Sequence, residues 1–176
     1  DKVMEITEKA MQGLFNFEES LIERVKLLKG IEASLLDDVF TQKIIFSKGA
    51  KELIEGANKK SIHTILVSGG FNFFAEKVAS YLGCKEFFAN ELIVKNGKLT
   101  GEVAMPILGA AQKKEILLAK MAELNINKSQ IVAIGDGAND LLMLAEAGLG
   151  VAYKAKPIVK KQTNAKLDHN SLAALL

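Results

Sequence analysis

Apolar residues recur at three- and four-residue spacing over residues 1–45, a pattern typical of helices with one buried face. These positions are Val3, Ile6, Ala10, Met11, Leu21, Ile22, Val25 and Leu28. Asn16, with Glu19 three residues later, has the form of a capping box and predicts a helix from about 17 to 29. A shorter helix is expected over 31–40. Residues 1–45 are therefore predicted to form a helical cap that packs on the rest of the chain.

From about residue 46 the pattern changes to short apolar, β-branched runs, each followed by a turn and a segment with helical spacing. The runs lie at 64–67, 131–134 and 149–152. Such runs are typical of parallel strands that are covered on both faces. After the first run, an Asn96-Gly97 turn between two short strand-like segments predicts an antiparallel hairpin at about 92–104. Residues 46–176 are therefore predicted to form an α/β core with a parallel sheet.

Composition excludes several classes of protein. The 176 residues are 49% hydrophobic and carry a net charge of +2, so no strong field for nucleic acid or an anionic membrane is expected. No apolar run approaches the length of a membrane span, about 18 residues. The one cysteine, Cys84, has no disulfide partner, which is typical of a reducing compartment. We expect a soluble cytoplasmic protein with no nucleic-acid or membrane partner.

The stretch from Ile131 to Met143 carries the strongest chemical signal. An apolar strand is followed by Gly135-Asp136-Gly137-Ala138-Asn139-Asp140 and then by a helix. Ligands collect at the carboxyl ends of parallel strands, and the glycines would let a ligand approach the backbone. A carboxylate at this edge suits Mg²⁺, which prefers oxygen ligands. The alternative is that Asp136 is a turn residue and that Asn139 or Asp140 only caps the helix.

The segment Ser68-Gly69-Gly70 repeats this arrangement after the first predicted strand. Backbone N–H groups at the start of a helix, together with a hydroxyl donor, form a site for an anion such as phosphate. The alternative is a tight strand-to-helix turn in which Ser68 is an ordinary cap.

Other candidates have weaker support. Lys113 is expected at the start of a helix, where a cation is unfavourable unless an anion is also present, although exposed lysines are common on helices. Arg24 and Phe17 would share one face of a helix, with Met11 on the preceding helix. Arginine binds carboxylates through two oxygens. The alternatives are a solvated Lys113, a surface Arg24, and core positions for Phe17 and Met11.

Several of these segments occur in the same order in a known family. They are Phe17-Glu18-Glu19-Ser20-Leu21 with Arg24-Val25, Ser68-Gly69-Gly70-Phe71, Ala89-Asn90, Lys98-Leu99-Thr100-Gly101, Lys113, the Gly135–Met143 stretch and Ala155-Lys156-Pro157. In this the chain resembles the phosphoserine phosphatases of the haloacid-dehalogenase-like superfamily over nearly its whole length. The resemblance implies a Rossmann-like core with an α-helical cap.

The resemblance also implies a role for each candidate. Ser68 and Gly69 would hold the transferring phosphate, Lys113 would neutralise it, and Asn139 would bind phosphate or water. Asp136 would bind Mg²⁺, and Asp140 would brace Lys113. In the cap, Arg24 would bind the substrate carboxylate while Phe17 and Met11 close over the substrate. These roles suit phosphoryl transfer, which depends on positioning and charge neutralisation.

One part of the family's site is absent. The family's nucleophile is the first aspartate of an Asp-x-Asp-x-Thr motif at the end of the first core strand, and the second is the general acid/base. This sequence contains no Asp-x-Asp, and the resemblance places the absent strand between 64–67 and 131–134. Two central strand edges would then lack a partner. We therefore expect a segment with the motif before Asp1, and expect the chain alone to be inactive.

The leading hypothesis is Mg²⁺-dependent hydrolysis of L-phosphoserine through an aspartyl-phosphate, the last step of serine biosynthesis. The alternatives are another small phosphomonoesterase or phosphotransferase of the same superfamily, and a non-catalytic relative that only binds metal and phosphate. A signalling domain with a parallel sheet would share the core and would not account for the cap helices or for the two glycine-containing loops.

Overall fold

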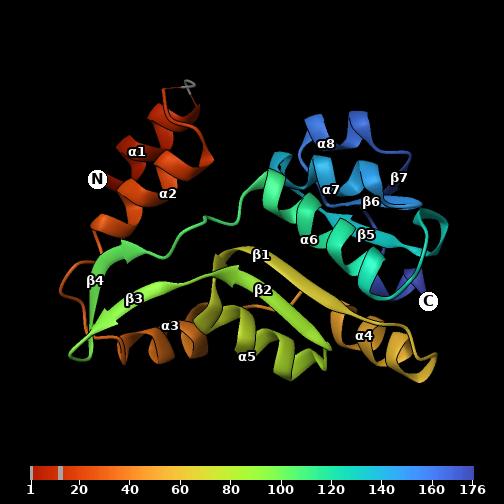
Figure 1. The fold of residues 1–176 in the computed structure, drawn as a ribbon, viewed down its shortest axis with the longest axis horizontal. Coiled ribbons are helices and arrows are strands. Elements are labelled where there is room, and N and C mark those ends of the chain that lie inside the picture. The colour runs from red at the N-terminus through yellow and green to blue at the C-terminus, as the bar shows by residue number, and fades with distance from the viewer. Residues whose placement is uncertain (1, 12–13) are drawn as a thin grey trace. The chain divides into compact units, whose positions relative to one another are not determined.

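The structure is a computed structural model that describes residues 2–11 and 14–176, and the chain divides into two compact units. The first unit comprises Asp1–Ile45, Ile65–Ser80 and Glu86–Ile107, and the second comprises Phe46–Thr64, Tyr81–Lys85 and Leu108–Leu176. The helices and strands of both units are labelled in Figure 1. No helix among the described residues is long and apolar enough to span a membrane.

The helices at the start of the first unit are α1 (Lys2–Met11), α2 (Phe17–Lys26) and α3 (Leu35–Lys43). The predicted capping box is confirmed, because the Asn16 N–H donates to Glu19 Oε2 at 2.8 Å and the Glu19 N–H donates to Asn16 Oδ1 at 2.9 Å. This reciprocal pair satisfies two N–H groups that the first turn of the helix would otherwise leave open.

The end of α2 and the start of α3 both differ from their predicted positions, because the segment between these helices forms hydrogen bonds with the hairpin. The Gly30 N–H donates to the Leu99 carbonyl at 2.8 Å, and the Ala33 N–H donates to the Gly97 carbonyl at 2.8 Å. Gly30 adopts a φ of +84°, which an L side chain rarely allows. The first helix therefore ends at Lys26 instead of residue 29, and the next begins at Leu35 instead of residue 31.

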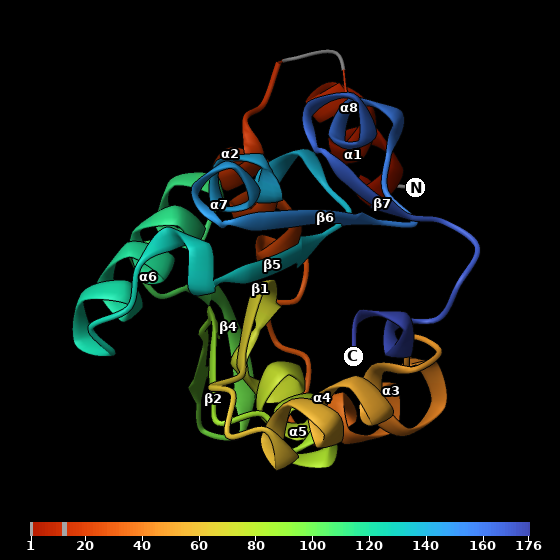
Figure 2. The same ribbon diagram turned by 90° about the vertical axis from the view of Figure 1, so that its right-hand side faces the viewer.

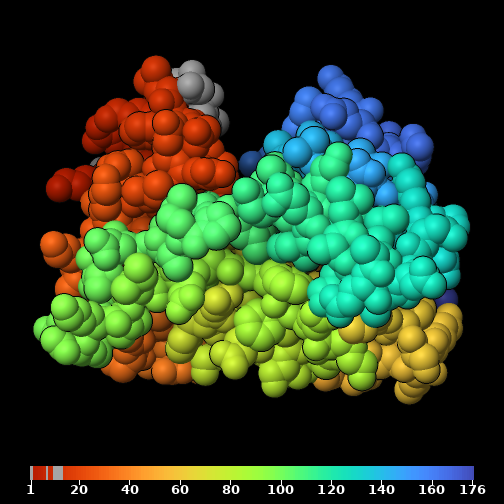
Figure 3. Space-filling view, viewed as in Figure 1, coloured from red at the N-terminus to blue at the C-terminus, as the bar shows by residue number. Residues whose placement is uncertain are grey.

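The rest of the first unit contains strands and one helix. They are β1 (Ile65–Phe71), α5 (Asn72–Leu82), β2 (Glu86–Asn90), β3 (Leu92–Lys95) and β4 (Lys98–Val103). β1 and β2 are parallel, whereas β3 and β4 form the predicted antiparallel hairpin. The green atoms of the hairpin lie at the surface in Figure 3. Val94 of β3 is exposed. Leu21 and Val25 of α2 are buried in the same cluster as Ile107 and fix α2 in this unit.

The second unit is built on a parallel sheet in the order β5-β6-β7. Its elements are α4 (Ala50–Lys59), α6 (Ala110–Glu123), β5 (Val132–Gly135), α7 (Leu141–Glu146), β6 (Leu149–Tyr153), α8 (Pro157–Gln162), β7 (Ala165–Leu167) and the 3₁₀ turns η1 (Lys128–Gln130), η2 (Ala138–Asp140) and η3 (Leu172–Leu175). Both α7 and α8 lie on one face of the sheet (Figure 2). Their Leu144 and Val159 side chains share one buried cluster with Ala133 and Ala152 of the strands.

Both edges of each parallel sheet lack a partner strand among the described residues, and β1 and β5 each form one of these edges. β1 pairs with β2 alone, and β5 pairs with β6 alone. These are the two edges that the sequence predicts to lack a neighbour. The mixed α/β fold with parallel strands agrees with the predicted fold class, and the strands β2 and β7 were not predicted.

Candidate functional site

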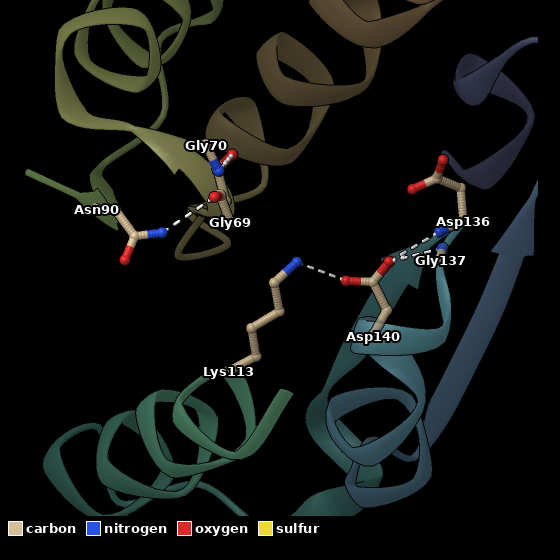
Figure 4. Close-up of polar contacts among 8 residues, drawn as sticks. Gly69, Gly70, Asn90, Lys113, Asp136, Gly137 and Asp140 are labelled. Atoms are coloured by element: carbon tan, nitrogen blue, oxygen red, sulfur yellow. Dashed lines mark hydrogen bonds and ion pairs between the residues drawn. The ribbon is translucent and has the colours of Figure 1, made fainter. Parts of the chain in front are cut away.

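Asp140 is the centre of a polar cluster in the second unit. Its Oδ2 accepts hydrogen bonds from the backbone N–H groups of Asp136 and Gly137, both at 3.0 Å. Its Oδ1 lies 2.6 Å from the Nζ of Lys113 (Figure 4). Asp140 is only 4% exposed. A carboxylate that is removed from water needs such partners, and here one side chain fixes both the loop after β5 and the lysine.

Lys113 reaches Asp140 because α6 packs on α7 and on the η2 turn. It lies in the first turn of α6 and is 5% exposed, so the alternative of a solvated lysine is wrong. Asp140 compensates the buried ammonium charge. An ammonium group has three N–H donors, and the bond to Asp140 uses one of them. The ammonium group, held in place by Asp140, can therefore offer its further N–H donors to an anionic group.

The glycines on either side of Asp136 serve a purpose that the sequence did not reveal. A Cβ at Gly135 would lie 2.5 Å from the Cβ of Asp140, and a Cβ at Gly137 would lie 2.5 Å from Oδ1 of Asn139. Real Cβ atoms essentially never come this close to another atom. These glycines therefore make room for side chains of their own loop, and the expectation that they also let a ligand approach stays a prediction.

The Asp136 carboxylate is exposed, and no hydrogen bond or ion pair joins it to any residue that the structure describes. In Figure 4 it points away from the Asp140 carboxylate, although the Asp136 N–H faces Asp140. Asn139, at the middle of η2, is half-buried. The helix-cap alternative is not supported, because no side-chain hydrogen bond among the described residues caps α7. Asp140 instead accepts the N–H of Gly137 at the start of η2.

An exposed carboxylate at the end of a strand suits a hard cation. The described residues contain no group of three or more His, Cys, Asp or Glu side chains that could hold a metal ion. Asp136 could therefore provide one ligand, and a Mg²⁺ ion there would draw its other ligands from water, substrate or further carboxylates. This fits Mg²⁺, which usually keeps several waters and binds through one or two carboxylates.

The Ser68-Gly69-Gly70 segment lies within β1 in the first unit, not at the start of a helix as predicted. β1 continues to Phe71, and α5 begins at Asn72. Ser68 does not cap α5, because its Oγ accepts the Gly70 N–H at 3.0 Å within the strand. The amide of Asn90 donates to the Gly69 carbonyl at 3.0 Å (Figure 4).

Sequence reasoning assigned no role to Asn90, which is 2% exposed. The signals in the sequence were its place as a polar residue after the run Glu86–Ala89 and the Ala89-Asn90 pair among the segments of the resemblance. A buried amide must be hydrogen-bonded, so a polar residue at the end of a buried strand was a candidate for a structural contact. Which atom it contacts depends on strand register, which the sequence does not specify.

The cap candidates are in the first unit. Arg24 is half-buried, and its Nε donates to the Ser20 carbonyl at 3.1 Å. No other hydrogen bond or ion pair joins it to the described residues. Phe17 begins α2 and packs against the buried cluster of Leu21, so its core alternative is supported. Met11 ends α1, and its side chain lies outside what the structure describes.

Cys84 is not a candidate nucleophile. Burial raises the pKa of its thiol, and smaller effects of a backbone hydrogen bond and of Lys51 act in the opposite direction. A thiol with a raised pKa is protonated near neutral pH, whereas the thiolate is the reactive form.

Comparison with known proteins adds a family to this geometry. Residues 4–145 match the model of the haloacid dehalogenase-like hydrolase family. The chain is 38% identical over 175 residues to a phosphoserine phosphatase of Archaeoglobus fulgidus, covering 99% of this chain and 51% of the relative. It is 42% identical over 176 residues to a phosphoserine phosphatase of Lactococcus lactis, covering 100% of this chain and 81% of the relative.

A solved structure agrees with these relatives. The crystal structure of a probable phosphoserine phosphatase from Vibrio cholerae superposes with a TM-score of 0.92 at 36% identity, covering 99% of this chain and 54% of that one. The chain thus spans about half the length of the Archaeoglobus relative and of the Vibrio structure. From the family match and from relatives of this identity over nearly its whole length, the chain belongs to the haloacid dehalogenase-like hydrolase family.

Proposed function

We propose that the polypeptide containing this chain hydrolyses L-phosphoserine to L-serine and phosphate, the last step of serine biosynthesis. The observation that carries the proposal is the buried Lys113–Asp140 pair beside the loop that follows β5. The names of the relatives supply the substrate, since both are phosphoserine phosphatases at about 40% identity. The whole polypeptide's activity rests on this similarity together with the geometry of the pair.

In this proposal Lys113 neutralises oxygens of the transferring phosphoryl group. Phosphoryl transfer asks the protein chiefly to position an in-line attack and to compensate charge on the equatorial oxygens. Asp140 holds the ammonium in place, because a buried lysine with no counter-charge would be costly. Asn139 is proposed as a further ligand of phosphate or of a water molecule.

Ser68 and Gly69 are proposed to bind phosphoryl oxygens as well. The Ser68 Oγ accepts the Gly70 N–H through a lone pair, so this bond does not use the hydroxyl hydrogen. That hydrogen is then available to an oxygen of a phosphate. The Gly69 N–H is proposed as a second donor from the same segment.

No residue of this chain is assigned the nucleophilic attack, because its 176 residues contain no Asp-x-Asp pair. The activity test therefore uses the intact polypeptide that contains this chain. This polypeptide is expected to release phosphate from L-phosphoserine with a kcat/KM at least about tenfold above its kcat/KM for p-nitrophenyl phosphate, since the carboxylate and amine of serine add specific contacts. Equal rates on all esters would indicate a general phosphomonoesterase, transfer to an alcohol would indicate a phosphotransferase, and binding without release would indicate a non-catalytic relative.

Phosphatases of this family are generally metal-dependent, and we propose that Mg²⁺ is the ion and Asp136 one of its ligands. Mg²⁺, when bound, supplies positive charge that compensates the phosphate. Asp136→Asn is expected to weaken Mg²⁺ binding by at least about tenfold, because the substitution removes the charge of a hard oxygen ligand. Isothermal titration with Mg²⁺ measures the change.

The control for this prediction is Asp168→Asn. Asp168 pairs with Lys160 at 2.8 Å in the same unit and is not part of the loop after β5. We expect this variant to bind Mg²⁺ as the unaltered protein does. If both variants bound Mg²⁺ with unchanged affinity, Asp136 would not be a ligand.

We place the preference for serine in residues 1–45, the proposed cap, where Arg24 would bind the substrate carboxylate and Phe17 and Met11 would cover it. Arg24→Ala is expected to raise KM for phosphoserine about 10- to 100-fold, since a hydrogen bond to a charged group contributes about 1.5–3 kcal/mol. KM for phosphoethanolamine, which lacks the carboxylate, is expected to stay unchanged. Steady-state kinetics with both esters make the measurement.

Lys26→Ala is the matched control on the same helix, because Lys26 is an exposed cation that pairs with Glu23 at 2.5 Å. It should alter KM for neither ester. An equal rise of both KM values in Arg24→Ala would show that Arg24 does not recognise the carboxylate.

A further inference from the structure

The Ser68-Gly69-Gly70 segment is a bulge in the pairing of β1 with β2. Val67 pairs with Phe88 and Phe71 pairs with Asn90, so three residues of β1 face the single residue Ala89 of β2. The ladder cannot pair every backbone group of the longer segment. The conformation of the bulge must therefore be fixed by contacts other than regular strand pairing.

Two of these contacts hold the same peptide group at its opposite ends. The Gly69 carbonyl and the Gly70 N–H belong to one planar peptide unit. The carbonyl accepts a hydrogen bond from Asn90 Nδ2 at 3.0 Å, and the N–H donates to Ser68 Oγ at 3.0 Å. Because glycine flanks this unit on both sides and is conformationally permissive, rotation of the unit meets little steric resistance once either contact is lost.

Asn90 is the contact that comes from outside the bulge. It is 2% exposed, and it is the last residue of β2. Rigid strand pairing through Phe88 delivers its amide to the Gly69 carbonyl, whereas Ser68 belongs to the bulge and moves with it. Of the two contacts, the Asn90 amide is thus the one anchored to the neighbouring strand.

We propose that Asn90 is a positioning residue for the phosphate-binding segment. By holding the Gly69–Gly70 peptide it keeps the Ser68 Oγ occupied as an acceptor of the Gly70 N–H, so that the hydroxyl hydrogen remains for a phosphate oxygen. The inference rests on the proposed function, since it assigns Asn90 to the phosphate site of that reaction. Asn90 itself need not touch the substrate.

The first test needs no catalysis. Asn90→Asp is nearly isosteric and cannot donate to the Gly69 carbonyl when ionised. We expect hydrogen exchange of the Gly70 amide to be at least about tenfold faster in this variant, because the peptide is then free to rotate away from Ser68. Amide exchange followed by NMR on the intact polypeptide makes the measurement. Unchanged exchange at Gly70 would overturn the proposal.

Thr64→Val is the matched control. Thr64 is also buried, and its Oγ1 accepts the Lys85 N–H at 3.2 Å just before β1 and β2 begin. This substitution also removes one side-chain-to-backbone hydrogen bond, at a place outside the bulge. It is expected to leave both the exchange of Gly70 and the kinetics of phosphoserine hydrolysis unchanged, even where it lowers the melting temperature.

The second test is kinetic and separates this inference from the proposed function. In Asn90→Asp we expect kcat for phosphoserine to fall by about 10- to 100-fold and inhibition by inorganic phosphate to weaken by a similar factor, as for misplacement of a binding group. An unaltered polypeptide that does not hydrolyse phosphoserine refutes the proposed function, and the exchange result still decides the role of Asn90. An active polypeptide whose kcat is unchanged in Asn90→Asp refutes the inference alone.

A second variant protects both tests against failure of the first to fold. Asn90→Ser is uncharged and too short to reach the Gly69 carbonyl. It is expected to show the same faster exchange at Gly70 and the same loss of kcat, and normal values for both would again overturn the proposal.

Discussion

Lys113→Met is expected to remove most of the proposed phosphoserine hydrolysis by the intact polypeptide, with kcat falling by about a hundred- to a thousandfold, as when a preorganised donor is removed from a reaction site. The same change leaves the Asp140 carboxylate buried with no counter-charge. Breaking one partner of a buried pair costs about 3–5 kcal/mol, so a marked loss of stability is also expected. Steady-state kinetics and urea unfolding measure the two effects.

The next residue along the chain provides the control. Lys114 pairs with Glu146 at 2.6 Å, but the two side chains are 38% and 32% exposed. An ion pair so accessible to water contributes little to stability, so Lys114→Met should have little effect on stability or on kcat. Comparing Lys113→Met with Lys114→Met separates the effect of losing the buried charge from the effect of losing any positive charge on α6.

A double substitution separates catalysis from stability. Lys113→Met combined with Asp140→Asn removes the uncompensated carboxylate, while an amide oxygen can still accept the N–H groups of Asp136 and Gly137. Relative to Lys113→Met alone, the double variant should regain part of the free energy of unfolding and should regain no kcat. If Lys113→Met alone kept more than about a tenth of the original kcat, Lys113 would not be the group that neutralises the phosphoryl oxygens.

Most of the core was predictable because its strands have simple patterns. The runs at 64–67, 131–134 and 149–152 each lie within or overlap a strand, and the hairpin turn is at Asn96-Gly97 as predicted. β7 was missed because it has only three residues, and β2 because its Phe87-Phe88 pair has no distinctive spacing. The start of α3 was misplaced because residues before it bond to the hairpin, a tertiary contact that local pattern does not contain.

For the site, the sequence identified the loops but not how they are held. Local pattern alone favoured a solvated Lys113, and its burial depends on how α6 packs on α7. The glycines beside Asp136 were assigned to ligand access, although the space they leave is filled by Asp140 and Asn139. Asn90 acts across two strands whose register shifts between Val67 and Phe71, so its contact follows from tertiary structure alone.

The loop after β5 depends on a glycine in a way that gives the second large effect. In Gly135→Ala the new Cβ would lie 2.5 Å from Asp140 Cβ and 2.7 Å from its Oδ2, so the Asp140 side chain must move. Asp140 would then lose its alignment with Lys113 and with the N–H groups of Asp136 and Gly137. A displacement of about 1 Å at a positioning group can cost about a hundredfold in rate, and we expect kcat to fall by at least that factor.

Gly150→Ala tests whether this effect is specific to Asp140. The new Cβ at residue 150 would lie 2.5 Å from the Leu144 carbonyl oxygen. This overlap is as severe as that at Gly135, but it involves a backbone atom and not the Asp140 side chain. Overpacking costs about 1–3 kcal/mol, so both variants should unfold at lower urea concentrations. Only Gly135→Ala should lose kcat when rates are expressed per folded molecule. Equal losses of kcat in both would mean that the folded sheet as a whole, and not the placement of Asp140, limits the reaction.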